Sequence, residues 1–458
     1  MTRPIEEELP VLRQGYTDAS ITDEIGGIPL RKAPKGWLLG FAISFVLLMV
    51  LIVAVLYLFA VGVGIWGVNI PVAWGFAIIA FVFWIGIGHA GTLISAILLL
   101  MHQSWRTSIS RFTEAMTLFA IASAALFPIL HLGRPWLFYW LIPYPSAIGA
   151  WPQFRSPLVW DVFAISTYGT LSLIFWYIGL VPDLASMRDR ARSGLAKVGY
   201  GIMALGWRGS AVHWHRYQTA YVILAALAAP LVVSVHSVVS FDFAVAIVPG
   251  WHSTIFPPYF VAGAILSGFA MVLVLVIPIR RIYKLEGFIT ERHLDNSAKI
   301  LLLTGLIVSY GYFSEAFYAW YSADEFHHYM MYNRAFGDYA PYFWALIAFN
   351  FLAPQVFWSR RLRRHIPTLF VVSLLVLLGM WYERFVIVVQ SLHRDYLPSS
   401  WAHYNATFWD WATLLGSFGL FFSLLFVFVR LLPMVSISEV RELAHHERDK
   451  GHGHGGAG

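Results

Sequence analysis

The chain contains no cysteine and few charged residues, and each shortage excludes some classes of protein. Without thiolates, its 458 residues cannot hold an iron–sulfur cluster through cysteine, attach haem c covalently or form a disulfide. Any redox work therefore uses metal centres on a partner or haems ligated by histidine. Charged residues make up 12% of the sequence, whereas a soluble protein of this length carries roughly 25%. With 59% hydrophobic residues, the composition indicates a polytopic membrane protein.

Ten apolar runs are long enough to cross a bilayer as helices. A β-barrel would instead show short segments of alternating polarity. The expected spans are 37–65, 70–102, 110–132, 157–182, 214–240, 256–280, 297–321, 341–359, 366–390 and 408–431. We therefore predict an all-α polytopic membrane protein, with a transmembrane domain over 37–431 between an N-terminal tail, 1–36, and a His/Gly-rich tail, 432–458. The low complexity of the last part of this tail, "HHERDKGHGHGGAG" (445–458), predicts that this part is disordered.

The distribution of Lys and Arg predicts which way the spans run. If the N-terminus is cytoplasmic, 26 of the 31 basic residues fall in the two tails and in the loops on the same side. The opposite side holds Arg134, Arg155, Arg334, Arg384 and Arg394. Both termini are therefore expected in the cytoplasm, with Trp- and Tyr-rich loops facing outward. The net charge of +6 follows from this topology and does not indicate a nucleic-acid partner.

Ionisable residues from three spans are expected to share the outer leaflet. His131 closes the third span in the run "FPILHLGRPW", and Arg134 follows at the lip. Asp161 lies about one turn into the fourth span, and His236 and Asp242 lie near the outer end of the fifth. Ionisable groups within a membrane are costly and are candidates for function. A His or Asp at a helix end can equally face interfacial water or cap a neighbouring helix.

This grouping suits the oxidation of a quinol. The reaction releases two electrons and two protons, and it needs an apolar slot for the ring with a hydrogen-bonding base at each hydroxyl. His131 and Asp161 are expected to form the catalytic pair, in which the carboxylate orients the imidazole and stabilises its charged form. An outward position would release the protons outside the cell.

A second set of polar residues is expected deeper in the membrane. His89 lies in the middle of the second span, Glu114 near the cytoplasmic start of the third, and Glu315 in the outer half of the seventh. These three are candidates for a proton path, with hydrogen-bonded core residues as the alternative. Glu383 and Asp410 are expected to lie at span ends and to face the outer interface.

Three runs carry a resemblance to a known family. "GHAGTLISAILLL", "HLGRPW" and "RSPLVWDVF", in this order within ten spans, resemble the NrfD/polysulfide-reductase family of membrane subunits. Within that family the chain is most similar to the larger quinol-binding membrane subunit of alternative complex III. The resemblance covers nearly the whole chain. It implies two four-helix bundles, spans 2–5 (about 70–240) and 6–9 (about 256–390), flanked by spans 1 and 10.

The resemblance also implies a cofactor, a set of partners and a membrane. Menaquinol or ubiquinol is expected at the outer face of the first bundle, with no cofactor bound covalently to the chain. The residues expected to contact it are His131 and Asp161, with Arg134, His236, Asp242 and Tyr168 as further candidates. Electrons are expected to pass to an iron–sulfur subunit on the periplasmic face of a bacterial inner membrane. The other expected partners are a second NrfD-like membrane subunit and both multihaem and monohaem cytochrome c subunits.

Three other classes remain open from the sequence. A di-haem cytochrome b would use His pairs on facing helices at matched depth, and His89 has no evident partner at its depth. A secondary transporter often has internal repeats and a midplane site, whereas these polar groups gather at one face. A purely structural membrane anchor is the third alternative.

Overall fold

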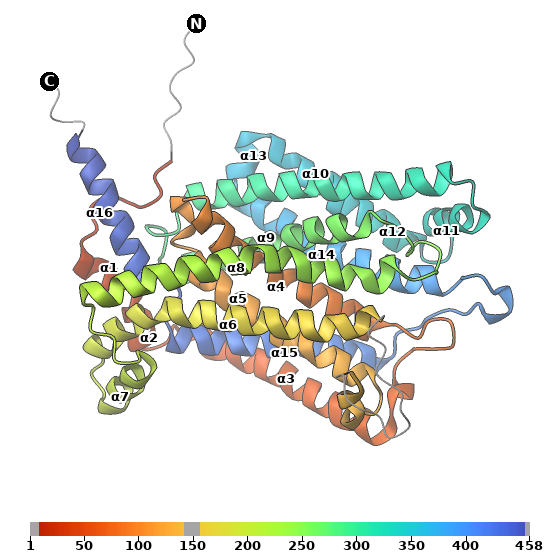
Figure 1. Ribbon diagram of the computed structural model, residues 1–458, viewed down its shortest axis with the longest axis horizontal. Helices are drawn as coiled ribbons and strands as arrows, with labels where there is room; N and C mark the ends of the chain where they lie inside the picture. Colours follow the sequence, from red (N-terminus) through yellow and green to blue (C-terminus); the bar gives the residue numbers. More distant parts are fainter. Residues whose placement is uncertain (1–8, 142–155, 454–458) are drawn as a thin grey trace, which may run out of the picture.

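The computed structural model describes residues 9–141 and 156–453. Within these ranges, ten helical stretches are long and apolar enough to cross a membrane, and they run side by side (Figure 1). The number of these helices and their side-by-side arrangement confirm the all-α polytopic fold. The ten stretches are α3 (Lys35–Val61), α4 (Phe76–Leu100), α5 (Ser110–His131), α6 (Pro157–Arg190), α8 (Ala211–Ala244), α9 (Phe256–Ile282), α10 (Glu291–Tyr321), Ala340–Trp358, Ile366–Gln390 and α15 (Phe408–Leu431).

Two of these stretches change their helical winding along their length. Ala340–Trp358 comprises α12 (Ala340–Leu346), the π-helical η4 (Ile347–Leu352) and the 3-10 segment η5 (Ala353–Trp358). Ile366–Gln390 comprises α14 (Ile366–Phe385) and the π-helical η6 (Val386–Gln390). The shorter elements are α1 (Asp18–Ile25), α2 (Gly27–Leu30), η1 (Val63–Ile65), η2 (Ser104–Arg106), η3 (Pro135–Leu141), α7 (Gly194–Met203), α11 (Glu325–Phe336), α13 (Arg360–Arg364), η7 (Pro398–Ser400) and α16 (Ile437–Gly453).

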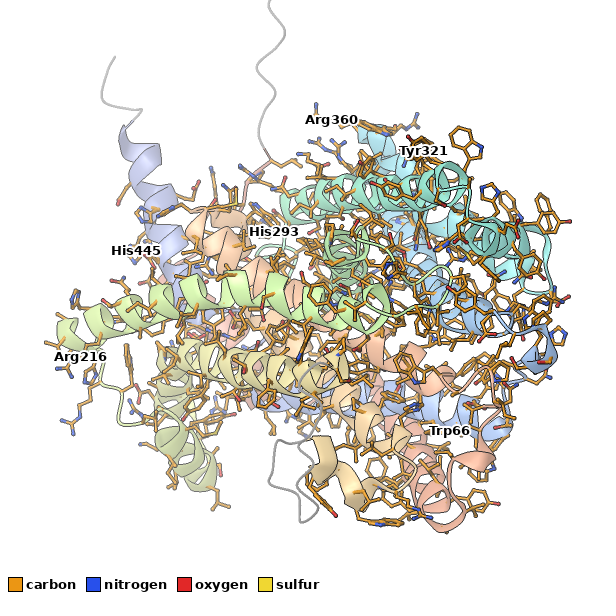
Figure 2. All side chains as sticks on the ribbon, turned by 45° about the vertical axis from the view of Figure 1, so that its right-hand side comes forward. Trp66, Arg216, His293, Tyr321, Arg360 and His445 are labelled. Carbon is orange, nitrogen blue, oxygen red and sulfur yellow. The ribbon has the colours of Figure 1, made fainter. Side chains whose placement is uncertain are left out.

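The two ends of the helix array differ in what they carry. One end, which we call the terminal face, holds α1, α7 and α16 (Figure 1). The opposite end, the distal face, holds α11 and the loop between η6 and α15. Arg216 and His445 lie toward the terminal face, whereas Trp66 and Tyr321 lie toward the distal end (Figure 2).

Packing between helices divides the spans into two bundles. α4, α5, α6 and α8 form the first, and α9, α10, α14 and the 340–358 stretch form the second. α4 and α9 contact each other and join the two bundles. The first and last spans, α3 and α15, pair with each other, and α15 rests on α5. The two expected bundles are therefore present; α15 lies against the first bundle, and α3 packs against α15.

The closest approach within the first bundle depends on a glycine in "GHAGTLISA". A Cβ at Gly91 of α4 would lie 1.9 Å from the carbonyl oxygen of Thr113 on α5, so any larger residue would force the helices apart. Small residues let membrane helices pack closely, because dispersion contacts and interhelical hydrogen bonds drive their association. Where the two helices approach, the Thr117 hydroxyl donates a hydrogen bond to the carbonyl oxygen of Gly88 at 2.6 Å.

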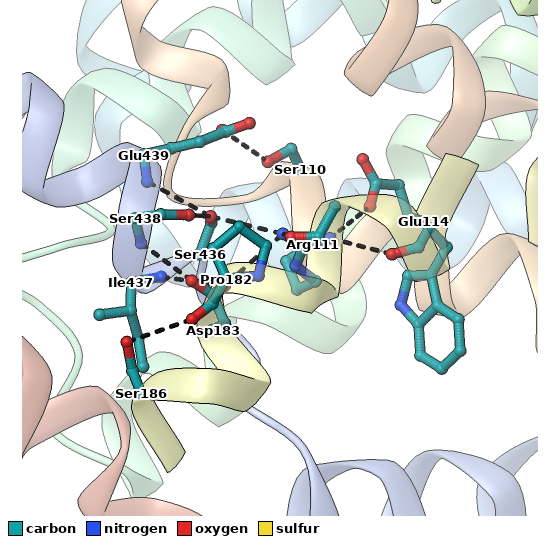
Figure 3. Close-up of polar contacts among 12 residues, drawn as sticks. Ser110, Arg111, Glu114, Pro182, Asp183, Ser186, Ser436, Ile437, Ser438 and Glu439 are labelled. Atoms are coloured by element: carbon teal, nitrogen blue, oxygen red, sulfur yellow. Dashed lines mark hydrogen bonds and ion pairs between the residues drawn. The ribbon is translucent and has the colours of Figure 1, made fainter. Parts of the chain in front are cut away.

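The C-terminal tail contains the helix α16, Ile437–Gly453, so the disorder predicted for 445–458 is wrong over 445–453. The first two N–H groups of α16, those of Ile437 and Ser438, donate to the carboxylate of Asp183 on α6 at 3.2 and 3.0 Å (Figure 3). An anion at a helix N-terminus satisfies its free N–H groups and its dipole. Val440 and Leu443 bury one face of the helix. The prediction considered only the His- and Gly-rich end, whereas the residues that anchor the helix precede that end in the sequence.

A buried guanidinium connects this cap to the first bundle. Arg111 on α5 lies 3.2 Å from the carboxylate of Glu114 and 3.5 Å from that of Asp183. All three side chains are almost completely buried, so each charge depends on its partners. α5, α6 and α16 are therefore joined by one network at the terminal face (Figure 3).

We predict that Asp183→Ala releases α16 from the bundle. Removing one partner of a buried ion pair costs about 3–5 kcal/mol, and here the substitution also removes the helix cap. Limited trypsin digestion of the detergent-solubilised protein should then cut at Arg441 several times faster than in the wild type. Asp189→Ala is the matched control, because Asp189 is exposed and forms its ion pair with the partly exposed Arg188. Equal digestion of both variants would contradict the role of Asp183.

Candidate functional site

A cavity of about 390 Å³ lies in the first bundle near the distal face. All four helices of that bundle contribute to its wall, and Phe138 of η3 closes one side. Most of the wall is apolar, as at Ile78 and Phe81 of α4 and Ile165 of α6. Cavities of this size and composition are typical of sites for small organic ligands.

The rim of this cavity faces what would be the lipid. Ile129 and Leu132 of α5, Phe138 of η3 and Leu158 of α6 all line it, and each is between 36% and 48% exposed. Exposed apolar side chains on membrane helices contact acyl chains. A ligand with a long apolar tail therefore has a route between the cavity and the bilayer.

Three ionisable residues from three helices line the same cavity. They are His131 at the end of α5, Asp161 in the second turn of α6 and Asp242 in the last turn of α8. Apart from the interaction between the two carboxyl groups, both carboxylate oxygens of Asp161, Nδ1 of His131 and Oδ1 of Asp242 are buried and have no hydrogen-bond partner within the described part of the chain. Buried polar atoms almost always have partners. This cluster is therefore suited to a ligand that donates hydrogen bonds.

The contacts inside the cluster differ from the expected His131–Asp161 pair. Asp161 interacts electrostatically with Asp242 across the α6–α8 contact, and no hydrogen bond joins it to His131 among the described residues. The ring of His131 instead meets the edge of Trp74, with ring centroids 6.4 Å apart. Sequence reasoning missed Trp74, because interfacial tryptophans are common and none stands out by pattern alone.

Tyr168 and His236 lie outside the cavity lining and join His89 deeper in the bundle. The rings of His89 and His236 are 4.5 Å apart, and those of His89 and Tyr168 are stacked at 5.0 Å. All three side chains are buried. Both ring nitrogens of His236 and Nε2 of His89 have no hydrogen-bond partner among the residues that the structure describes.

Two expectations about these histidines are wrong. His236 is not at the outer end of its span, because α8 continues eight residues beyond it to Ala244, about 12 Å at 1.5 Å per residue. His89 does have a partner at its depth, since α4 and α8 are neighbours in the bundle. Their rings are in direct contact, however, so a porphyrin plane does not fit between them in the way that a pair of axial ligands requires.

The remaining predicted residues lie apart from the cavity. Arg134 is exposed beyond the end of α5 and is not among the lining residues. Glu114 lies at the opposite end of the bundle, in the network with Arg111. Glu315 belongs to the second bundle and pairs with Arg334 at 2.6 Å. Arg155 lies outside the described residues.

Glu383 and Asp410 are buried, so the expectation that they face the outer interface is wrong. Glu383 is 1% exposed and pairs with Arg384 in the second bundle. Asp410 accepts hydrogen bonds from the Gly67 N–H and the Tyr404 hydroxyl, each at 2.8 Å. The sequence holds a signal for the first case: "VIVVQ" continues the apolar run beyond Glu383 and Arg384, which places both charges within the span.

Known proteins resemble the chain over this whole region. A putative membrane subunit of dimethyl sulfoxide reductase from Halobacterium salinarum is 27% identical over 357 residues, which cover 74% of this chain and 76% of that protein. A selenate reductase subunit from Mesobacillus selenatarsenatis is 22% identical over 387 residues, which cover 79% and 86%. Residues 64–394 match the family described as "Polysulphide reductase, NrfD". Since this match includes both bundles and every residue that lines the cavity, the chain belongs to the NrfD family.

Proposed function

We propose that the chain is the quinol-oxidising membrane subunit of an oxidoreductase complex. The cavity between α5 and α6 is the proposed quinol site. The observation that carries this proposal is the set of unpartnered acceptors on Asp161, His131 and Asp242 at the polar end of an apolar, lipid-accessible cavity. The names of the two relatives, both subunits of reductases, support the same class of complex.

The cavity matches the chemistry of a quinol. Bound quinol supplies two electrons and two protons. Its two hydroxyl donors correspond to the unpartnered acceptors, and its ring and tail correspond to the apolar wall and the exposed rim. The geometry favours the reduced form, because a quinone carbonyl would leave these acceptors without a donor.

The cluster residues then have distinct roles. Asp161 accepts the proton of one hydroxyl, as a buried general base. Asp242 interacts with Asp161 and lies in the last turn of α8, so it passes that proton toward the distal face. His131 accepts the proton of the other hydroxyl through Nδ1, while the edge of Trp74 holds its ring in place.

The electrons leave through a partner, since the chain has no cysteine with which to ligate an iron–sulfur cluster. We propose that an iron–sulfur subunit docks on the distal face, close to the cavity. From the excess of Lys and Arg on the opposite side, we place the distal face outside the cytoplasm and both termini inside. Cytochrome c subunits and a second NrfD-like subunit, as in alternative complex III, are the proposed further partners.

A row of polar groups in the first bundle is the proposed proton path. It starts at His236 and His89 and continues through the Tyr168 hydroxyl, which donates to Thr92 Oγ1 at 3.0 Å. The hydroxyl of Ser172 lies 3.2 Å from that of Thr92. Glu114 ends the row near the terminal face. Glu315 lies in the other bundle and is not on this path.

We predict that Asp161→Asn lowers quinol oxidation about a hundredfold or more, since a positioned general base contributes 10²–10⁴-fold. The amide keeps the shape and loses the proton acceptor. The measurement is turnover of the purified complex with a short-chain quinol and an artificial electron acceptor. Asp189→Asn, the same change at an exposed site on the terminal face, should keep wild-type turnover. An assembled Asp161→Asn complex with wild-type turnover would refute the proposed base.

We predict that Tyr168→Phe interrupts the proposed proton path without emptying the quinol site. It removes the hydroxyl that lies within hydrogen-bond distance of the Gly88 carbonyl oxygen and Thr92 Oγ1, and it keeps the ring that stacks on His89. In proteoliposomes the number of protons moved per electron should fall, while quinol affinity stays at the wild-type value. An unchanged proton-to-electron ratio would exclude this row of groups as a path.

A further inference from the structure

A second cavity, of about 320 Å³, lies in the second bundle. Its wall comes from α9, α10, α11, the 340–358 stretch and the end of the ninth span. The π-helical segments η4 and η6 both contribute to it, through Ile347 and Phe351 and through Val386 and Ile387. π-helical turns within longer helices are frequent at functional sites.

The two cavities correspond in the order of their helices. In the first bundle, polar groups come from the end of the second helix, at His131, and of the fourth, at Asp242. In the second bundle they come from the same two places, at Glu315 near the end of α10 and at Glu383 near the end of α14, whereas Asp161 on the third helix of the first bundle has no ionisable counterpart in the lining of the second cavity. Each cavity also takes an aromatic residue from near the start of its first helix.

The second cavity also has an apolar rim toward the bilayer. Phe313, Trp344 and Phe351 line it and are 70%, 53% and 40% exposed. A tailed amphiphile could therefore enter this cavity from the lipid in the same way as the first.

The polar chemistry of the two cavities is opposite. In the second cavity the carboxylates already have cationic partners: Glu315 pairs with Arg334, and Glu383 pairs with Arg384. Glu383 also accepts a hydrogen bond from the Tyr312 hydroxyl. Arg334 lines the cavity, is 2% exposed, and its Nε–H has no acceptor in the part of the chain that is described. The unsatisfied group here is a donor, whereas those of the first cavity are acceptors.

We propose that the second cavity binds the oxidised quinone. A quinone carries carbonyl acceptors and no hydroxyl. It can therefore accept a hydrogen bond from the free Nε–H of Arg334 without displacing either ion pair. Phospholipid ester and phosphate oxygens share this acceptor chemistry. The two ion pairs sum to zero charge, which favours a neutral carbonyl head over a phosphate. This inference rests on the proposed function, since it takes a quinone as the substrate of the chain.

The test uses the complete purified complex in nanodiscs of one defined phospholipid. A short-chain, photoreactive azidoquinone is added either oxidised or reduced, and the labelled peptides are identified by mass spectrometry. The oxidised probe should label 309–316 and 343–351, and the reduced probe should label 125–132 and 158–166. Native mass spectrometry of the unlabelled complex reports whether quinone or phospholipid is retained.

Variants assign each label to its cavity. Ala316→Trp fills the second cavity and should remove only the second label, and Ala125→Trp should remove only the first, because each alanine lines one cavity. Leu303→Trp, at an exposed position of α10 outside the lining, is the matched control and should change neither. Arg334→Lys keeps the charge beside Glu315 and removes Nε–H, so the oxidised probe should bind about tenfold more weakly, as for one lost hydrogen bond to a charged group.

The outcomes separate the two proposals. Labelling of the first cavity alone would overturn the second site and leave the proposed function standing. Labelling of neither cavity would overturn both. Retention of phospholipid in place of quinone, with labelling of the second cavity unaffected by Ala316→Trp, would make that cavity a lipid site and overturn this inference. Loss of the second label in Ala316→Trp and its weakening in Arg334→Lys would support it.

Discussion

A polar group inside a bilayer needs a partner, because hydrocarbon offers neither donors nor acceptors. The described structure meets this requirement for the buried carboxylates of Glu114 and Asp183 at the terminal face, which Arg111 joins, so that α16 is fixed to the bundle. It leaves the requirement unmet at Asp161, His131 and Asp242. The buried carboxylates at the terminal end are paired with a cation, whereas those at the distal end have no cationic partner in the described part of the chain and suit a ligand that donates hydrogen bonds.

The same reasoning distinguishes the two bundles. Both have a cavity near the distal end with an apolar rim, and both draw polar groups from the ends of their second and fourth helices. The carboxylates of the second bundle are in ion pairs, whereas Asp161 and Asp242 of the first have no cationic partner among the described residues. A quinol that gives up protons therefore suits the first cavity, and a carbonyl head suits the second.

The ten spans and the cluster of His131, Asp161 and Asp242 could be predicted because each depends on local sequence: apolar length sets a span, and span direction sets the depth of a residue. Contacts between spans could not be predicted in this way, because they depend on how the helices pack. The contact between His89 and His236 depends on which helices are neighbours, and α8 proved longer than its apolar run. The helix α16 forms because Asp183, 254 residues earlier in the chain, caps it.

The central claim is that the acceptors of the first cavity bind a quinol that reduces a partner on the distal face. A cryo-electron microscopy map of the purified assembly with a quinol analogue bound tests it most directly. The analogue head should lie within hydrogen-bond distance of Asp161, and an iron–sulfur subunit should cover the distal end of α4, α5, α6 and α8. Analogue density elsewhere in the chain, or an iron–sulfur subunit on the terminal face, would contradict the claim.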